Sequence, residues 1–162
     1  MTCLDLTLFS SLLKSNWRLK LFFLKKLPMA LISGIKAQYV GEDTSRVTIP
    51  FNYFTKNPFR SMYFACQSMA AEFSTAIICL KALEKREEEF SIIVVEMEAS
   101  FSKKAKGVTT FQCNKPKELE SLIDRSISDE TPQAITFKSI GRNEEGEEVA
   151  AFSFTWSIKV RD

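Results

Sequence analysis

Hydrophobic and polar residues alternate along much of the chain with a period of two, the pattern of β-strands that bury one face. These stretches lie at residues 32–51, 92–101, 108–113, 135–140 and 149–160. In the second of them, the alternation predicts one shared face for Ile93, Val95, Met97, Ala99 and Phe101. Turn residues at Gly41-Glu42-Asp43 and at Gly146 indicate two hairpins. Strands linked in this way predict an antiparallel sheet with one face directed at a core.

A stretch of different character, residues 62–83, is apolar on every side of a helix apart from Gln67, Glu72 and Lys81. Such a helix belongs either in the centre of a core or in a membrane. Because it lies between strand patterns, we expect it to fill the concave side of the sheet. The elements together predict an α+β domain over residues 32–162, in which about six antiparallel strands wrap around one long central helix.

Residues 1–31 predict an additional amphipathic helix that packs on this domain, with its helical pattern at residues 7–26 and Pro28 soon after its end. Basic residues interrupt its apolar positions, so it lacks the continuous apolar run of a signal peptide or a membrane span. Membrane contact is therefore not expected. The alternative is a peripheral contact with a bilayer surface through Trp17, Phe22 and Phe23.

The ionisable side chains exclude several classes of chemistry. No histidine occurs among the 162 residues, which removes any Ser-His-Asp or Cys-His pair and leaves acid–base chemistry mainly to carboxylates. The formal net charge of +2 at pH 7 does not indicate a nucleic acid as partner. The four cysteines form no CxxC motif, so we expect reduced thiols, a cytoplasmic protein and no metal site.

Glu72 is the single ionisable side chain between residues 62 and 80. A carboxylate that loses hydration is expected to have a raised pKa, which is the profile of a general base or acid. Its helical neighbours include Ala65 and Ser68, which are small and leave room for an approaching molecule. Two interpretations follow: Glu72 belongs to a catalytic site, or another element packs there and Glu72 pairs with an arginine or lysine.

The loop and helix start of PaaI-like hotdog thioesterases are similar to residues 57–72 of this chain, NPFRSMYFACQSMAAE. In that family an Asn precedes a His-Gly pair at the helix entry, and an acidic residue follows on the helix, as Glu72 follows Asn57 here. Residues 101–107 and 147–160 are similar to two later strands of the family. The resemblance covers about residues 32–160 and is closest to an uncharacterised branch of the superfamily, a domain of unknown function.

This resemblance implies a hotdog fold and a site that hydrolyses thioesters. Glu72 would activate water or attack the thioester carbonyl, and Asn57 would orient that water. Backbone N–H groups near Phe64 and Ala65 would form an oxyanion hole at the helix start. The family His-Gly pair falls on Tyr63-Phe64, so Tyr63 would offer a hydroxyl in place of the histidine, and Phe64 would narrow the approach.

The remaining candidates would line the path of the substrate. Lys103 and Lys104 would contact the phosphates of coenzyme A, or else only keep a strand end solvated. Ser61 would form a hydrogen bond near the carbonyl or cap the helix, and Ser68 continues the small stripe beside Glu72. Coenzyme A enters only as part of the substrate, so no separate cofactor is expected.

We therefore expect a hydrolase that acts on an acyl-CoA or acyl-carrier thioester. The alternative is a catalytically inactive hotdog protein in which Phe64 blocks the site. Such a protein would bind an acyl chain in its cavity or serve a structural role. A homodimer, or a tetramer built from it, is expected because the sheet leaves a hydrogen-bonding edge and the family's sites lie at such an interface.

Overall fold

The computed structural model describes residues 9–39 and 43–161. The start of the expected N-terminal helix and the turn at Gly41-Glu42 lie outside these ranges. Within them, six strands form one sheet in the order β1-β2-β4-β5-β6-β3, and every neighbouring pair is antiparallel. The predicted α+β architecture is confirmed. The strands are β1 (Lys36–Tyr39), β2 (Thr44–Pro50), β3 (Phe90–Phe101), β4 (Val108–Asn114), β5 (Gln133–Arg142) and β6 (Glu148–Val160).

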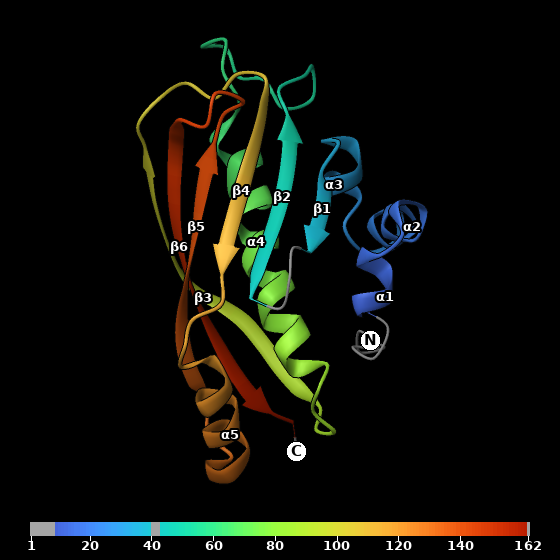
Figure 1. The fold of residues 1–162 in the computed structure, drawn as a ribbon, viewed down its shortest axis with the longest axis vertical. Helices are drawn as coiled ribbons and strands as arrows, with labels where there is room; N and C mark the ends of the chain where they lie inside the picture. Colours follow the sequence, from blue (N-terminus) through green and yellow to red (C-terminus); the bar gives the residue numbers. More distant parts are fainter. Residues whose placement is uncertain (1–8, 40–42, 162) are drawn as a thin grey trace.

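The long helix α4 (Phe64–Leu83) runs along the sheet, and α5 (Leu119–Asp129) covers one end of β5 and β6 (Figure 1). Helix α4 begins two residues later than expected, because Met62 donates its N–H to the carbonyl oxygen of Ala105 and Tyr63 is extended. No helix in the described ranges is long and apolar enough to cross a membrane. One side of α4 is fully buried and includes Ala70, Ala71, Ser74, Ile77 and Ile78.

Buried hydroxyl groups join α4 to the sheet. Ser74 Oγ lies 2.7 Å from Ser139 Oγ of β5, and Ser45 Oγ of β2 donates to the Ser74 carbonyl oxygen at 2.6 Å. The indole N–H of Trp156 in β6 donates to Thr75 Oγ1 at 3.0 Å. A buried polar group that loses its partner is costly, so these bonds fix how the helix is seated against three strands.

Strand β3 forms one edge of the sheet and contains a β-bulge between Val94 and Glu96. Val94 and Met97 both lie opposite buried aromatic residues of β6. The prediction that Ile93 and Val95 share a face with Met97 is therefore wrong, because the extra residue at the bulge exchanges the two faces of the strand. Ile93 and Val95 are instead 62% and 57% exposed.

The N-terminal segment folds as three short helices rather than the single helix expected: α1 (Phe9–Leu13), α2 (Asn16–Lys26) and α3 (Pro28–Ile32). Ser15 is extended between α1 and α2, and Pro28 cannot continue α2 but begins α3. The Phe23 ring packs edge-on against Phe73 of α4, with 5.2 Å between ring centroids. The segment therefore packs beside β1 and α4 (Figure 1).

The cysteines of the described residues are Cys66, Cys79 and Cys113, and all three are free thiols. Burial raises the pKa of Cys79 and of Cys113 to about 12. Both thiols therefore stay protonated at neutral pH, and neither is suited to act as a nucleophile.

Candidate active site

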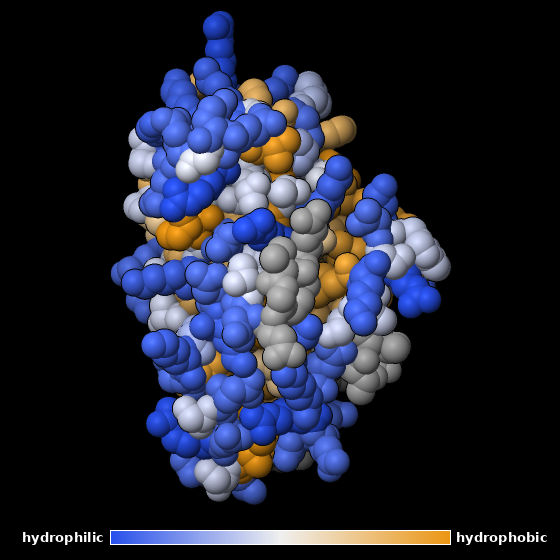
Figure 2. All heavy atoms as spheres, in the orientation of Figure 1, coloured by the Kyte–Doolittle hydropathy of each residue, from blue (hydrophilic) through white to orange (hydrophobic). Residues whose placement is uncertain are grey.

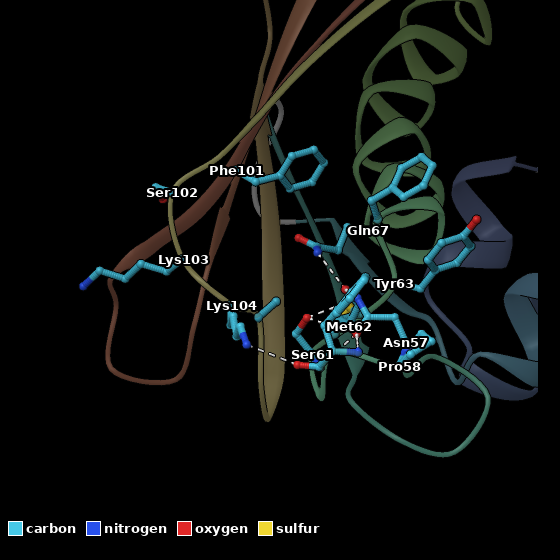
Figure 3. A pocket seen from close by; sticks show the side chains of 13 residues that line it. Asn57, Pro58, Ser61, Met62, Tyr63, Gln67, Phe101, Ser102, Lys103 and Lys104 are labelled. Atoms are coloured by element: carbon cyan, nitrogen blue, oxygen red, sulfur yellow. Dashed lines mark hydrogen bonds between the residues drawn. The ribbon is translucent and has the colours of Figure 1, made fainter.

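A cleft of about 560 Å³ opens where the start of α4 meets the end of β3 (Figure 3). Its walls come from the loop before α4, the first turn of α4 and residues 101–105. The predicted site residues that it brings together are Asn57, Ser61, Tyr63, Phe64, Lys103 and Lys104. The other three candidates, Ala65, Ser68 and Glu72, do not line it.

Asn57 is the centre of the hydrogen bonds within the loop. Its Oδ1 accepts from the N–H groups of Phe59 at 2.9 Å and Ser61 at 3.2 Å. Its Nδ2 donates to Ser61 Oγ at 3.1 Å and to the Met62 carbonyl oxygen at 3.4 Å. These bonds hold a tight turn in which Arg60 adopts a positive φ of 59°. To orient a water molecule, the Asn57 amide has to release one of these loop contacts.

Ser61 belongs to the same network, because its buried hydroxyl contacts Asn57. The alternative that Ser61 caps α4 is wrong. Tyr63 occupies the N-cap position, and no side chain caps the helix.

The start of α4 leaves two backbone donors, one on Phe64, which lines the cleft, and one on the next residue, Ala65. The Tyr63 N–H already donates to the Thr55 carbonyl oxygen at 2.7 Å. The Gln67 N–H donates to the Tyr63 carbonyl oxygen at 3.2 Å, which is the first hydrogen bond of the helix type. The N–H groups of Phe64 and Ala65 have no acceptor within the described residues. Two free N–H groups at the positive end of a helix dipole are suited to bind an oxyanion.

Gln67 projects from the first turn of α4 into the space between Phe101 and Tyr63 (Figure 3). It is only 4% exposed, and its Nε2 donates to the Met62 carbonyl oxygen at 3.2 Å. Its Oε1 has no partner in the part of the chain that the structure describes. A buried acceptor without a partner is costly, so this oxygen is placed to accept a hydrogen bond from a ligand or a water molecule.

Sequence reasoning did not select Gln67, which entered only as a polar interruption of an apolar helix. The available signal was its position: it is the single amide in α4 and lies one turn after the helix start. Phe101 was also missed as a site residue, because its place across the cleft depends on the β3–α4 arrangement and not on local sequence.

Aromatic rings form the apolar walls of the cleft. The rings of Tyr63 and Phe64 meet edge to face, with 4.8 Å between centroids. Phe101 lies across the cleft from Tyr63 (Figure 3). Phe64 is itself exposed and lines an open cleft. The substitution of the family glycine by Phe64 therefore shapes the entrance without closing it.

The side chains of the two lysines of the cleft point in different directions. Lys103 points away from it and pairs with Glu147 at 2.6 Å (Figure 3). Lys104 donates from Nζ to the Phe59 carbonyl oxygen at 3.2 Å and so connects the two walls. Of the pair, Lys104 is the better placed to meet an anion that enters the cleft.

Glu72 lies two turns further along α4, on the side that carries the less buried Ala65 and Ser68. The residue is half-buried, and desolvation raises the pKa of its carboxyl from 4.5 to about 7. No ion pair involves Glu72 within the described ranges, so the alternative of a paired structural carboxylate finds no partner there. The Ser68 hydroxyl donates back to the Phe64 carbonyl oxygen at 3.0 Å.

The distance along the helix separates Glu72 from the cleft. Glu72 follows Phe64 by eight residues, which is roughly 12 Å at ~1.5 Å per residue. A carbonyl oxygen held by the N–H groups of Phe64 and Ala65 is therefore out of reach of the carboxyl of the same chain. The candidates form two groups: the cleft with its donors, and Glu72.

Solved structures share this architecture. A protein of unknown function from Pseudomonas aeruginosa, described as a probable thioesterase, superposes with a TM-score of 0.74 at 19% identity, over 91% of this chain and 97% of its own. A thioesterase from Haemophilus influenzae gives 0.66 at 17% identity, over 90% and 91%. The PaaI protein of the E. coli phenylacetic acid degradation operon gives 0.61 at 14% identity, over 90% and 94%. These likenesses confirm the predicted hotdog fold.

Sequence comparison identifies the family. No curated protein sequence matches the chain significantly. The model of a family described as a domain of unknown function, DUF4442, matches residues 15–158, a span that includes the cleft and Glu72. The expectation that the chain is closest to a domain of unknown function is confirmed. The chain belongs to the DUF4442 family.

Proposed function

We propose that the protein hydrolyses acyl thioesters, with Glu72 as general base or nucleophile. The observation that carries the proposal is the carboxyl of Glu72, which is half-buried, has no cationic partner within the described residues and has a pKa raised to about 7. A base with a pKa near the working pH is well matched to removing a proton from water. The thioesterase descriptions of the Pseudomonas and Haemophilus structures support the same reaction class.

In the proposed reaction, the thioester carbonyl oxygen accepts hydrogen bonds from the N–H groups of Phe64 and Ala65. Glu72 removes a proton from water while the water oxygen bonds to the carbonyl carbon. The C–S bond then breaks, and the departing thiolate takes the proton from Glu72 and leaves as a thiol. Gln67 Oε1 accepts a hydrogen bond from the attacking water, and Asn57 keeps the loop in place. In the nucleophilic variant, the Glu72 carboxylate attacks the carbonyl carbon and the C–S bond breaks, so that the thiolate departs and takes a proton from water. A water molecule then cleaves the resulting anhydride to the free acid and regenerates the Glu72 carboxyl group.

The separation of about 12 Å between Glu72 and the helix start requires a second copy of the chain. Strand β3 is an unpaired edge that exposes Ile93, Val95 and Met97, as an association surface would. Two copies joined through this edge about a two-fold axis carry their α4 helices on one continuous sheet in opposite directions. Glu72 of one copy then faces the helix start of its partner, so the proposed active unit is a homodimer.

Apolar walls and Lys104 favour an acyl-CoA as substrate, with the acyl chain against Phe64 and Phe101 and a phosphate near the lysine. The purified full chain is tested for thiol release from acyl-CoA thioesters with short, medium and long chains. Activity that is lost in Glu72→Gln and kept in Glu145→Gln, a change in an exposed turn residue, supports the assignment. Absence of thiol release by the unmodified protein across the panel overturns it.

The dimer is tested by Val95→Glu, which places a charge on the β3 edge. We expect a monomer by analytical ultracentrifugation, with thiol release at the level of Glu72→Gln. A monomer that keeps full activity contradicts the shared site.

A second candidate function is acyl binding without hydrolysis. It is favoured by Phe64, which replaces the glycine of the PaaI-like motif that residues 57–72 resemble. An acyl chain found by mass spectrometry in the purified protein, together with no turnover of any thioester, supports this alternative.

A further inference from the structure

Helix α2 exposes apolar residues on the side opposite to its packing face. Leu19 and Phe23 are buried against the domain. Trp17, Leu21 and Leu24 are spaced by four and three residues, so they form one stripe on the outer surface of the helix. Trp17 is 65% exposed and Leu24 is 60% exposed. Of the two phenylalanines that the membrane alternative named from the sequence, Phe23 is wrong because it belongs to the core, whereas Phe22 is half-buried.

Helix α3 and the residue before it add further apolar surface. Leu27, Met29 and Ile32 are all exposed, and α3 packs directly on α2. A groove of about 230 Å³ beside the stripe is lined by Leu12, Leu21 and Phe22, with basic residues at its rim. On the face drawn in Figure 2, apolar surface is visible where Figure 1 places α1–α3, with hydrophilic side chains around it.

The charged side chains that this N-terminal segment itself contributes all have one sign. Residues 6–41 contain no aspartate or glutamate. With 3.6 residues per turn, Lys20 lies on one side of the apolar stripe, and Arg18 and Lys25 lie on the other. Because the whole chain has a net charge of only +2, the remainder of the chain is net negative. The net positive charge of the chain is thus carried by the segment that contains the exposed apolar stripe.

We propose that α2 and α3 dock the protein on the surface of an anionic lipid bilayer. Trp17, Leu21 and Leu24 enter the boundary between headgroups and acyl chains, and the basic side chains beside them contact lipid phosphates. This inference does not depend on the thioesterase proposal.

The charges favour a bilayer over a second copy of the chain. A two-fold contact through this face brings two identical basic surfaces together, which like-charge repulsion opposes. The face also lies beside β1, at the opposite edge of the sheet from β3. It therefore stays accessible in the homodimer proposed above.

Vesicle flotation of the full chain tests the proposal. We expect binding to phosphatidylcholine vesicles that contain phosphatidylserine, weakening as salt is raised, and little binding to phosphatidylcholine alone. Lys20→Glu/Lys25→Glu is expected to weaken binding by about tenfold or more. Lys117→Glu/Lys138→Glu, the same charge change at two exposed lysines elsewhere, is the matched control and is expected to bind like the unmodified chain.

Tryptophan fluorescence supplies an independent readout, because the chain has two tryptophans and Trp156 is buried. We expect a blue shift on adding anionic vesicles that disappears in Trp17→Phe. No flotation of the unmodified chain with anionic vesicles overturns the proposal, as does equal binding by the Lys20→Glu/Lys25→Glu variant. A lipid-free oligomer that Leu24→Ser dissociates also overturns it, since the face is then occupied by protein.

Discussion

Replacement of Glu72 by glutamine removes a negative charge whose burial lowers the stability of the folded protein. The pKa of this carboxyl is 4.5 without the fold and about 7 within it, because burial removes water from the ionised form. At ~1.4 kcal/mol per pKa unit, the full shift corresponds to roughly 3.5 kcal/mol. The residue keeps part of its exposure, so we expect about 1–3 kcal/mol.

The sign of the effect follows from the raised pKa. Below pH 4.5, Glu72 is protonated in both the folded and the unfolded chain, so its ionisation does not affect stability. As pH rises from 4.5 through 7, the unfolded chain releases the proton more readily, and the folded state loses stability. Glu72→Gln does not undergo this loss. We therefore expect the variant to match the natural protein near pH 4.5 and to be more stable above pH 7.

Thermal unfolding followed by circular dichroism between pH 4.5 and 8.5 measures this difference. For a chain of this length, about 2–4 °C per kcal/mol gives a higher Tm for Glu72→Gln by roughly 2–12 °C at pH 8. Glu145→Gln is the control and is expected to show no such pH-dependent gain. If the difference in stability between Glu72→Gln and the natural protein is the same at every pH, the Glu72 carboxyl does not have the raised pKa that desolvation would give it.

The same variant separates stability from catalysis. Loss of a general base costs about 10²–10⁴-fold in rate, so kcat for thioester hydrolysis is expected to fall by at least about 100-fold while Tm rises. In the natural protein, kcat/KM should increase with pH and level off above about 7. A flat profile between pH 6 and 8 contradicts the assignment of Glu72 as the base.

Three further substitutions test one buried group of the cleft and two buried contacts elsewhere in the core. Gln67→Met removes the buried unpaired oxygen, so we expect stability unchanged or raised by about 1 kcal/mol in urea unfolding, with kcat lowered at least about tenfold. Thr75→Val leaves the buried indole N–H of Trp156 without its acceptor, so we expect the free energy of unfolding to fall by about 1–3 kcal/mol in urea unfolding. An unchanged urea midpoint would show that this hydrogen bond does not stabilise the fold. In Gly141→Ala, the new Cβ lies 2.5 Å from Phe111 Cε1, so we expect a loss of about 1–3 kcal/mol and a lower Tm, whereas an unchanged Tm would show that the ring moves freely.

The sheet and its central helix were predictable because their patterns are local. Alternation over residues 135–140 and 149–160 and the apolar run at 62–83 each report which side of an element is buried. The β-bulge at Val95 was not predictable, because the strand continues to alternate through it and only pairing with β6 shows the extra residue.

The candidate site was predictable in composition but not in geometry. The spacing from Asn57 to Glu72 indicated one motif, yet the helix carries the two residues to different places, and the Asn57 amide is bound within its own loop. Gln67 became a candidate only when the fold showed a buried oxygen without a partner. The position of Gln67 in the helix could be read from the sequence, but the lack of a partner for its oxygen depends on long-range packing and could not.

The bulge in β3 also determines which changes of length this strand tolerates. Val94 and Glu96 already lie opposite consecutive residues of β6, Trp156 and Thr155, so Val95 is the one residue without a place in the ladder. Deletion of Val95 would keep every side chain of β3 on its present face. Deletion of Met97 with the bulge kept would instead turn Glu98 toward the inside and Phe101 away from the cleft. Homologues that differ in length within this strand should therefore have gained or lost their residue at this one point.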